Sequence, residues 1–180
     1  MAWTVWICGR PGSGKSTIAR ELESLLEESG LHAQVLGTDI LRKVVTPEPT
    51  YTEKERGVVY STLVFIAKIL NQNEVNVILD ATANRSAYRE KGKDEIENIL
   101  IAYVECPLEI CMKREAERKE TYGAPRDIYK RGLAGESDTV PGLGVLFEVP
   151  ENPDILLDSV KFTALENAKK ILNEILDRYY

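Results

Sequence analysis

The sequence predicts an α/β fold in which helices cover both faces of a parallel sheet of about five strands. Short apolar runs alternate with longer amphipathic segments along the 180 residues. The runs that predict strands cover residues 3–8, 33–36, 75–79, 100–104 and 155–157. Each connection between them is long enough for the helical crossover that parallel strands require. Glycines or polar residues follow the first three runs, at the edge where such sheets bind ligands.

Helices are predicted in the segments that connect these strands. Apolar residues after the first strand recur at helical spacing, and Gly30 stops that helix. Thr52 and Thr163 are each followed three residues later by glutamate, a capping box that opens a helix. Pro107 suits the first turn of another helix. The predicted helices cover residues 16–28, 52–71, 86–97, 107–120 and 163–178.

Residues 121–153 interrupt this alternation. The stretch is rich in glycine and proline, and a loop of that length in a compact chain is usually functional or disordered. A length of 180 residues suits one compact domain. We therefore expect residues 1–180 to form a single domain, with a lid at about residues 121–147.

The composition excludes several classes of protein. The formal net charge is −6, whereas a protein coated in nucleic acid is expected to be strongly basic. No apolar run approaches the roughly 20 residues that span a bilayer. With 3 cysteines and 1 histidine, buried free thiols are expected rather than a metal cluster. We expect a cytoplasmic protein with a small-molecule partner, no nucleic acid and no membrane, and the sequence leaves a homodimer open.

A glycine motif between the first strand and the first helix predicts a phosphate-binding loop. It matches the pattern G-x-x-x-x-G-K-[ST] completely. Backbone N–H groups in such a loop hold phosphate, Lys15 reaches the β- and γ-phosphates, and the Ser16 hydroxyl ligates Mg²⁺. ATP and Mg²⁺ are therefore the expected cofactors. The expected ATP-binding residues are Gly9, Arg10, Pro11, Gly12, Ser13, Gly14, Lys15, Ser16 and Thr17.

Carboxylates follow two further strands. Asp80 ends an apolar strand and resembles a Walker-B carboxylate that holds a water on Mg²⁺, with a helix N-cap as the alternative. Asp39 follows the second strand, where a carboxylate can take the proton of an attacking hydroxyl. Its alternative role is the N-cap of a helix over residues 40–44. Arg42 is suited to clamp an anionic substrate.

The same residues resemble the adenylyl-sulfate kinase (APS kinase) family. Asp39 and Arg42 match the Asp-x-x-Arg segment that follows the second strand in that family. Tyr51 and Arg56 match an aromatic residue with an arginine five positions later, at the start of the next helix. An aromatic ring that stacks a purine and cations that hold sulfate or phosphate agree with this match.

The later part of the chain continues the resemblance over nearly its whole length. Residues 106–111 resemble the family's PLEVC segment, and Arg114 follows as its lid arginine. Residues 129–136 resemble the family's lid, and residues 141–153 resemble its TGI…YEAPENP segment. Apart from Arg114, the mixed-charge run at 113–120 is typical of a solvated helix face.

The resemblance implies a P-loop kinase fold and transfer of the ATP γ-phosphoryl group to the 3′-hydroxyl of adenylyl sulfate. It implies that Asp39 is the general base, that Lys15 and Mg²⁺ stabilise charge, and that Arg114 belongs to the ATP site. The metal ligands remain Ser16 and Asp80. The implied substrate-binding residues are Asp39, Arg42, Tyr51, Arg56, Asn84 and Lys130.

The chain departs from the family pattern on the acceptor side. Val59 stands where the family usually has asparagine, and Ser61 and Thr62 replace an arginine pair. Asn84 falls near the position of a family serine. A P-loop kinase of another small hydroxyl acceptor is therefore the alternative. A regulatory nucleotide switch is a third reading, which the cluster of Asp39, Arg42, Tyr51 and Arg56 disfavours.

Overall fold

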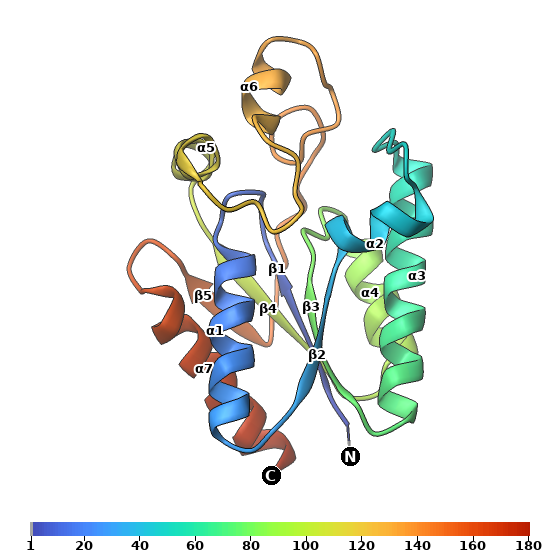
Figure 1. The fold of residues 1–180 in the computed structure, drawn as a ribbon, viewed down its shortest axis with the longest axis vertical. Helices are drawn as coiled ribbons and strands as arrows, with labels where there is room; N and C mark the ends of the chain where they lie inside the picture. Colours follow the sequence, from blue (N-terminus) through green and yellow to red (C-terminus); the bar gives the residue numbers. More distant parts are fainter. Residues whose placement is uncertain (1) are drawn as a thin grey trace.

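Within residues 2–180, the part of the chain that this computed structural model describes, a 5-stranded parallel sheet has the order β2-β3-β1-β4-β5 (Figure 1). The predicted fold class is confirmed, and each predicted strand is present. Strand β1 pairs with β3 on one side and β4 on the other, so the phosphate-loop strand is central. The strands are β1 (Thr4–Cys8), β2 (Ala33–Gly37), β3 (Asn76–Asp80), β4 (Ile99–Glu105) and β5 (Ile155–Asp158).

Helices cover both faces of the sheet, as predicted. The helices α1 and α7 pack together on one face, and α3 and α4 pack on the other (Figure 1). The described helices are α1 (Lys15–Glu28), α2 (Thr38–Val45), α3 (Glu53–Gln72), α4 (Ser86–Glu95), α5 (Leu108–Glu117), α6 (Ile128–Leu133) and α7 (Ala164–Tyr179).

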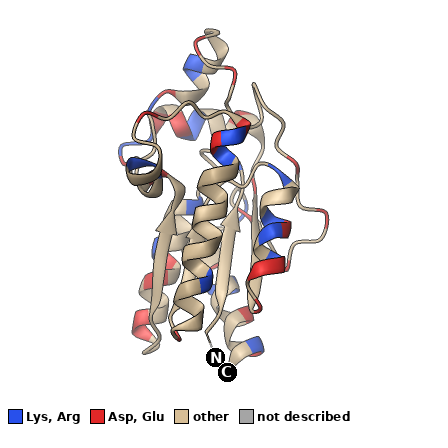
Figure 2. Ribbon diagram, turned by 90° about the vertical axis from the view of Figure 1, so that its right-hand side faces the viewer, with Lys and Arg blue, Asp and Glu red and all other residues tan. Residues whose placement is uncertain are grey.

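The core lies between the sheet and these helices. Fully buried side chains such as Trp3 and Leu22 fill the α1–α7 side, and Trp6 and Leu63 fill the α3–α4 side. Figure 2 shows the strands free of charged residues over most of their length, with charge on the helices and the upper loops. A smaller cluster around Tyr129 lies between α5 and α6. The rigid layers therefore support an upper end built from loops and short helices.

Two sequence predictions need correction in the upper region. Helix α5 ends at Glu117 rather than near residue 120, because Arg118 leaves the helix with extended backbone angles. The Arg118 guanidinium then bonds the Glu115 carboxylate and the Pro125 carbonyl. The stretch 121–153 also contains α6, which the sequence analysis missed. A helix of 6 residues is too short to show helical periodicity in the sequence.

The predicted helix starts are largely confirmed. Thr163 and Glu166 form a complete capping box. Thr52 caps α3 by accepting from the Glu55 amide, but the Glu55 carboxylate turns elsewhere, so the box there is half formed. All of Cys8, Cys106 and Cys111 are buried free thiols. None of the helices in residues 2–180 has the length and apolar character needed to cross a membrane.

Candidate active site

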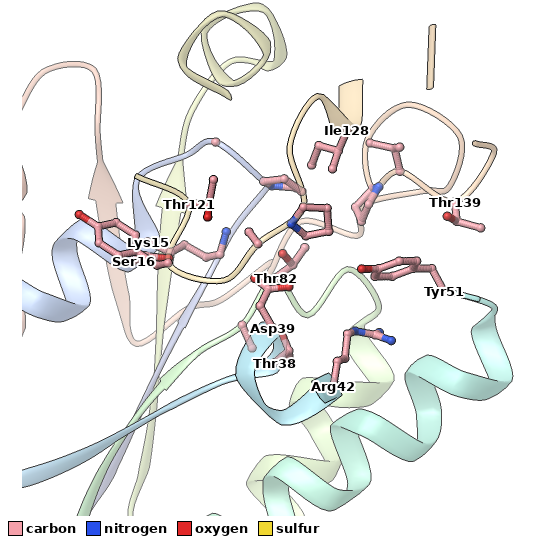
Figure 3. Close-up of a pocket in the computed structure, with 18 of the residues that line it drawn as sticks. Lys15, Ser16, Thr38, Asp39, Arg42, Tyr51, Thr82, Thr121, Ile128 and Thr139 are labelled. Atoms are coloured by element: carbon pink, nitrogen blue, oxygen red, sulfur yellow. The ribbon is translucent and has the colours of Figure 1, made fainter. Parts of the chain in front are cut away.

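One large cavity opens at the carboxyl ends of β1, β2 and β3. Its volume is about 710 Å³, and its walls come from the phosphate loop, α2, the start of α3 and the segments after α5. Figure 3 shows Lys15 and Ser16 at one end, Arg42 and Tyr51 at the other, and Asp39 between them. Ile128 and Thr139 close the cavity from the lid side. A nucleotide phosphate and an acceptor hydroxyl can therefore meet near Asp39.

The phosphate loop has the backbone that its glycines predict. Gly12 and Gly14 have φ angles of 78° and 102°, in the left-handed region that favours glycine. A Cβ atom on Gly12 would also clash with the Cys111 carbonyl, so the α5 backbone limits this position to glycine. Helix α1 begins at Lys15, directly after the loop, so its unpaired N–H groups face the cavity.

Most of the predicted ATP-binding residues line the cavity. Those that do are Pro11, Gly12, Gly14, Lys15, Ser16, Thr17 and Arg114. Gly9, Arg10 and Ser13 do not line it. The Arg10 guanidinium lies 5.2 Å from the centre of the Phe147 ring, and its Nη1 donates to the Cys106 carbonyl at 3.4 Å. Arg10 therefore braces the loop against the lid's far end.

Lys15, Asp39 and Asp80 form the charged centre of the cavity. Lys15 Nζ donates to the Arg10 carbonyl at 2.9 Å, which holds the ammonium inside the loop. Burial lowers the pKa of Lys15, and the carboxylates of Asp80 and Asp39 oppose that shift. Burial raises the pKa of Asp39, and the nearby Asp80 carboxylate raises it further. An aspartate with a raised pKa is a stronger base than an exposed one.

Ser16 and Asp80 suit a Mg²⁺ ion that is bound together with the nucleotide phosphates. They do not form a metal site from protein ligands alone. Both line the cavity beside the phosphate loop. The described residues contain no group of at least 3 His, Cys, Asp or Glu side chains that could hold a metal. Mg²⁺ is commonly held by one or two carboxylates together with substrate phosphates and waters. The alternative role of Asp80 is wrong, because the N-cap of α4 is Arg85.

The acceptor side is a stack of one ring and two cations. The Tyr51 ring has the Arg42 guanidinium at 4.6 Å and the Arg56 guanidinium at 5.8 Å from its centre. Arg42 and Arg56 are buried, at 6% and 8% exposure, so their charges are directed inward. Asp39 lies in the first turn of α2 and does not cap it, because the N-cap is Gly37. The structure thus brings Asp39, Arg42, Tyr51 and Arg56 together as predicted.

Residues 118–125 form a strap across the mouth of the cavity. The sequence analysis named none of them as a site residue, although residues 121–125 fall within the predicted lid. The Tyr122 ring lies 4.0 Å from the Arg20 guanidinium of α1. On the opposite side Gly123 packs against Ile40 and Lys43 of α2. The strap therefore contacts both α1 and α2 beside Asp39.

Two predicted substrate-binding residues do not line the cavity. Asn84 is 2% exposed and its Nδ2 donates to the Leu146 carbonyl at 3.2 Å. Lys130 points away because its neighbour Tyr129 is buried and donates from its hydroxyl to the Pro11 carbonyl at 2.8 Å. That anchor turns the other face of α6, with Ile128 and Arg131, toward the cavity.

The cavity also holds polar residues that the sequence analysis missed. They include Arg118, Arg131, Thr38, Thr82, Thr121 and Thr139. Arg118 follows Arg114 at a spacing of four residues within a run interpreted as a solvated face, and that spacing was the available signal. Thr38 immediately precedes Asp39, Thr82 follows Asp80 by two positions, and both lie beside Asp39 in Figure 3. Val59, a departure from the family pattern, is fully buried in the α3 face of the core.

The fold and the cavity define a kinase of the P-loop class. A phosphate loop leads into a helix, and a separate cluster with a candidate base and two arginines faces it across one cavity.

Comparison with known proteins identifies the family. The sequence model of the family described as adenylylsulphate kinase matches residues 1–158. An adenylyl-sulfate kinase from Halothermothrix orenii is 32% identical over 177 residues, which cover 98% of this chain and 91% of the relative. A probable adenylyl-sulfate kinase from Archaeoglobus fulgidus is 33% identical over 161 residues, covering 89% of this chain and 98% of the relative. The chain belongs to the adenylylsulphate kinase family.

The solved structures agree with this assignment. The APS kinase of Mycobacterium tuberculosis, solved in complex with AMPPNP and APS, superposes with a TM-score of 0.86 at 25% identity. The match covers 97% of this chain and 98% of that one.

Proposed function

We propose that this protein transfers the γ-phosphoryl group of ATP to the 3′-hydroxyl of adenylyl sulfate, giving 3′-phosphoadenylyl sulfate and ADP in sulfate activation. One observation carries the proposal: a single cavity joins the phosphate loop to the cluster of Asp39, Arg42, Tyr51 and Arg56. Membership of the adenylylsulphate kinase family supports the same acceptor.

On the donor side, Lys15 and the N-terminus of α1 neutralise the β- and γ-phosphates. Ser16 and Asp80 would hold Mg²⁺, which would add positive charge against the transferring group. Arg114 lines the cavity while its Nη2 donates to the Ser159 carbonyl at 2.7 Å, so its position is fixed from below. These residues orient ATP and stabilise the charge that spreads over the transferred group.

On the acceptor side, the Tyr51 ring stacks the purine of the acceptor, and Arg42 and Arg56 offer cations to its anionic groups. The Asp39 carboxylate accepts the proton of the 3′-hydroxyl as the oxygen forms its bond to the γ-phosphorus. The bond from that phosphorus to the β,γ-bridging oxygen breaks and ADP leaves. Asn84 and Lys130 make no contact with either substrate in this proposal, because they do not line the cavity.

Residues 1–180 act in this proposal as one kinase domain, and residues 121–147 act as its lid. A closed lid excludes water and so suppresses hydrolysis of ATP. The cytoplasmic location belongs to the proposal as well. The buried free thiols of Cys8, Cys106 and Cys111 support a reducing compartment.

A homodimer through α3 completes the proposal. Val58, Phe65 and Ile69 are 50%, 62% and 42% exposed and follow one another at the spacing of a helix–helix seam. Figure 2 looks onto the side where α3 lies in Figure 1, and the long helix facing the viewer carries few charged residues. Burying this stripe against a second copy removes apolar surface from water. Sedimentation of the protein and of a Phe65→Glu variant tests the contact.

The acceptor is tested by following ADP release with Mg²⁺, ATP and adenylyl sulfate, against sugars, polyols and nucleosides as competing acceptors. Adenylyl sulfate is expected to give the highest kcat/KM. Faster phosphorylation of another alcohol would contradict the proposed acceptor and favour the alternative of a different small-molecule kinase, while leaving the donor site unaffected.

A further inference from the structure

Glu55, in the first turn of α3, is a carboxylate that the catalytic scheme above does not use. Its side chain is only 12% exposed, and it does not line the cavity. It accepts hydrogen bonds from the Thr50 amide at 2.6 Å, the Thr50 hydroxyl at 2.7 Å and the Tyr51 amide at 3.2 Å. It also forms an ion pair with Arg42. All of these partners belong to the acceptor end of the cavity.

These bonds hold Tyr51 in a backbone conformation that it does not adopt readily. The φ angle of Tyr51 is 56°, in the left-handed region, where a bulky residue is strained. Such a conformation persists only where the surroundings fix it. The hydrogen bonds that the Thr50 and Tyr51 backbone amides donate to the Glu55 carboxylate supply that restraint. The Arg56 Nε also donates a hydrogen bond to the Tyr51 carbonyl at 3.0 Å.

The same carboxylate sets the direction of Arg42. The Arg42 guanidinium lies over the Tyr51 ring, 4.6 Å from its centre, and also pairs with Glu55. One group therefore fixes both the ring and the cation stacked on it. Pairing with Glu55 also leaves Arg42 with only part of its charge available to a ligand, so its orientation matters more than its charge.

The Glu55 carboxyl group is ionised near neutral pH. Burial alone would raise the pKa of Glu55, but the hydrogen bonds from Thr50, Tyr51 and Arg42 lower it to about 2. A neutral side chain in its place cannot make the same charge-assisted bonds. A purely structural role as a helix cap is already filled by Thr52.

We propose that Glu55 is a positioning residue for the acceptor: it touches no substrate, and it holds Tyr51 and Arg42 in the arrangement that receives the acceptor's base. This inference rests on the proposed function. It predicts that loss of Glu55 affects acceptor binding specifically, because ATP contacts a different end of the cavity.

The test compares Glu55→Gln with Glu53→Gln, a matched control in the same helical turn whose carboxylate is 75% exposed and pairs with Arg85 at 3.7 Å. In Glu55→Gln the KM for adenylyl sulfate should rise about tenfold or more, the loss of a charged hydrogen bond. Its kcat should change by less than about threefold, and the KM for ATP should stay at the wild-type value. The control should match the wild type in all three.

A double variant separates positioning from general destabilisation. Because Glu55 acts on both Arg42 and Tyr51, Glu55→Gln in an Arg42→Ala background should add a smaller loss in kcat/KM for adenylyl sulfate than it causes in the wild type. Additive losses would overturn the inference. Should Glu55→Gln fold poorly, Thr50→Val removes one bond to the carboxylate and should raise the same KM by a smaller factor.

Hydrogen exchange provides a readout that does not depend on the acceptor's identity. The amides of Thr50 and Tyr51 should exchange faster in Glu55→Gln than in Glu53→Gln, with no ligand present. If exchange and acceptor KM are both unchanged while the wild type phosphorylates adenylyl sulfate, the positioning role is wrong. If the wild type does not phosphorylate adenylyl sulfate but the exchange changes as expected, the proposed function fails and the positioning of Tyr51 stands.

Discussion

The guanidinium of Arg56 donates a 2.7 Å hydrogen bond to the carbonyl of Thr139, which joins the acceptor end of α3 to the lid. Its Nε also donates to the carbonyl of Tyr51 at 3.0 Å. One buried cation therefore connects Tyr51, at the proposed acceptor end, with the segment proposed as the lid. Under the proposed function, acceptor binding and lid closure are linked through this side chain.

Arg56→Ala is expected to weaken both the acceptor site and the lid contact. Loss of a charged hydrogen bond should cost about 1.5 to 3 kcal/mol in kcat/KM for adenylyl sulfate, roughly one to two decades. The KM for ATP should remain unchanged because the phosphate loop is intact. Steady-state kinetics with each substrate varied measures both values, and Arg126→Ala, an exposed arginine next to the strap that does not line the cavity, is the control. An equal rise in both KM values would indicate general disruption instead.

Lys15→Ala should abolish phosphoryl transfer while the protein stays folded. The ammonium neutralises charge on the transferring group, and loss of such a contact costs roughly 10²- to 10³-fold or more in kcat. Its single protein hydrogen bond goes to the Arg10 carbonyl within the loop, so the core packing does not depend on it. Turnover and thermal unfolding should be measured beside Lys113→Ala, an exposed lysine on α5. Near wild-type turnover in Lys15→Ala would disprove the donor-site assignment.

The sequence predicted those parts of the molecule that depend on local signals. Each strand is a short apolar run, and the phosphate loop is a contiguous motif, so neither needs long-range information. Asp39 and Arg42 were found from their place after the second strand, whereas Tyr51 and Arg56 were found through a resemblance, because their segment meets that of Asp39 only in the fold. Which side chains of residues 121–147 face the cavity could not be predicted in the same way.

The choice between Lys130 and Arg131 shows why. Both are cations in a short helix, and which one faces the cavity depends on the rotation of α6 about its axis. That rotation is set by the bond from Tyr129 to the Pro11 carbonyl, a contact between residues 118 positions apart. The Arg42–Glu55 pair was missed for a related reason: the sequence indicated a capping glutamate, whereas the fold brings a second partner to it.

The lid prediction concerns residues 121–147. Binding of ATP and adenylyl sulfate should slow hydrogen exchange across this segment, because a closed lid loses access to water. The contacts of Tyr122 with Arg20 and of Arg56 with Thr139 are the points where closure is expected to show most strongly. Helix α7, none of whose residues lines the cavity, serves as the internal reference for exchange rates. Equal exchange with and without nucleotides in residues 121–147 would argue against a lid.

Asp39→Asn is expected to remove activity and to stabilise the protein near neutral pH. The folded state raises the pKa of Asp39, first through burial and then through the Asp80 carboxylate. The ionised carboxylate is therefore less favourable in the folded chain than in the unfolded one. This destabilisation is fully present above the folded pKa and absent below the unfolded pKa of about 3.9. Asparagine has the same shape without the charge, so its melting temperature should exceed that of the wild type at pH 7.

The pH dependence separates this effect from other consequences of the substitution. The difference in melting temperature between Asp39→Asn and the wild type should shrink as the pH falls toward 4, because the wild-type carboxyl then becomes neutral. The same group should appear as the acidic limb of kcat/KM in the wild type, above the value of an ordinary aspartate, and loss of the base should lower kcat about 10²- to 10⁴-fold. Asp94→Asn, at an exposed position on α4, is the matched control. A lower melting temperature for Asp39→Asn at pH 7, or a kcat close to the wild type, would show that Asp39 is a structural residue and not the base.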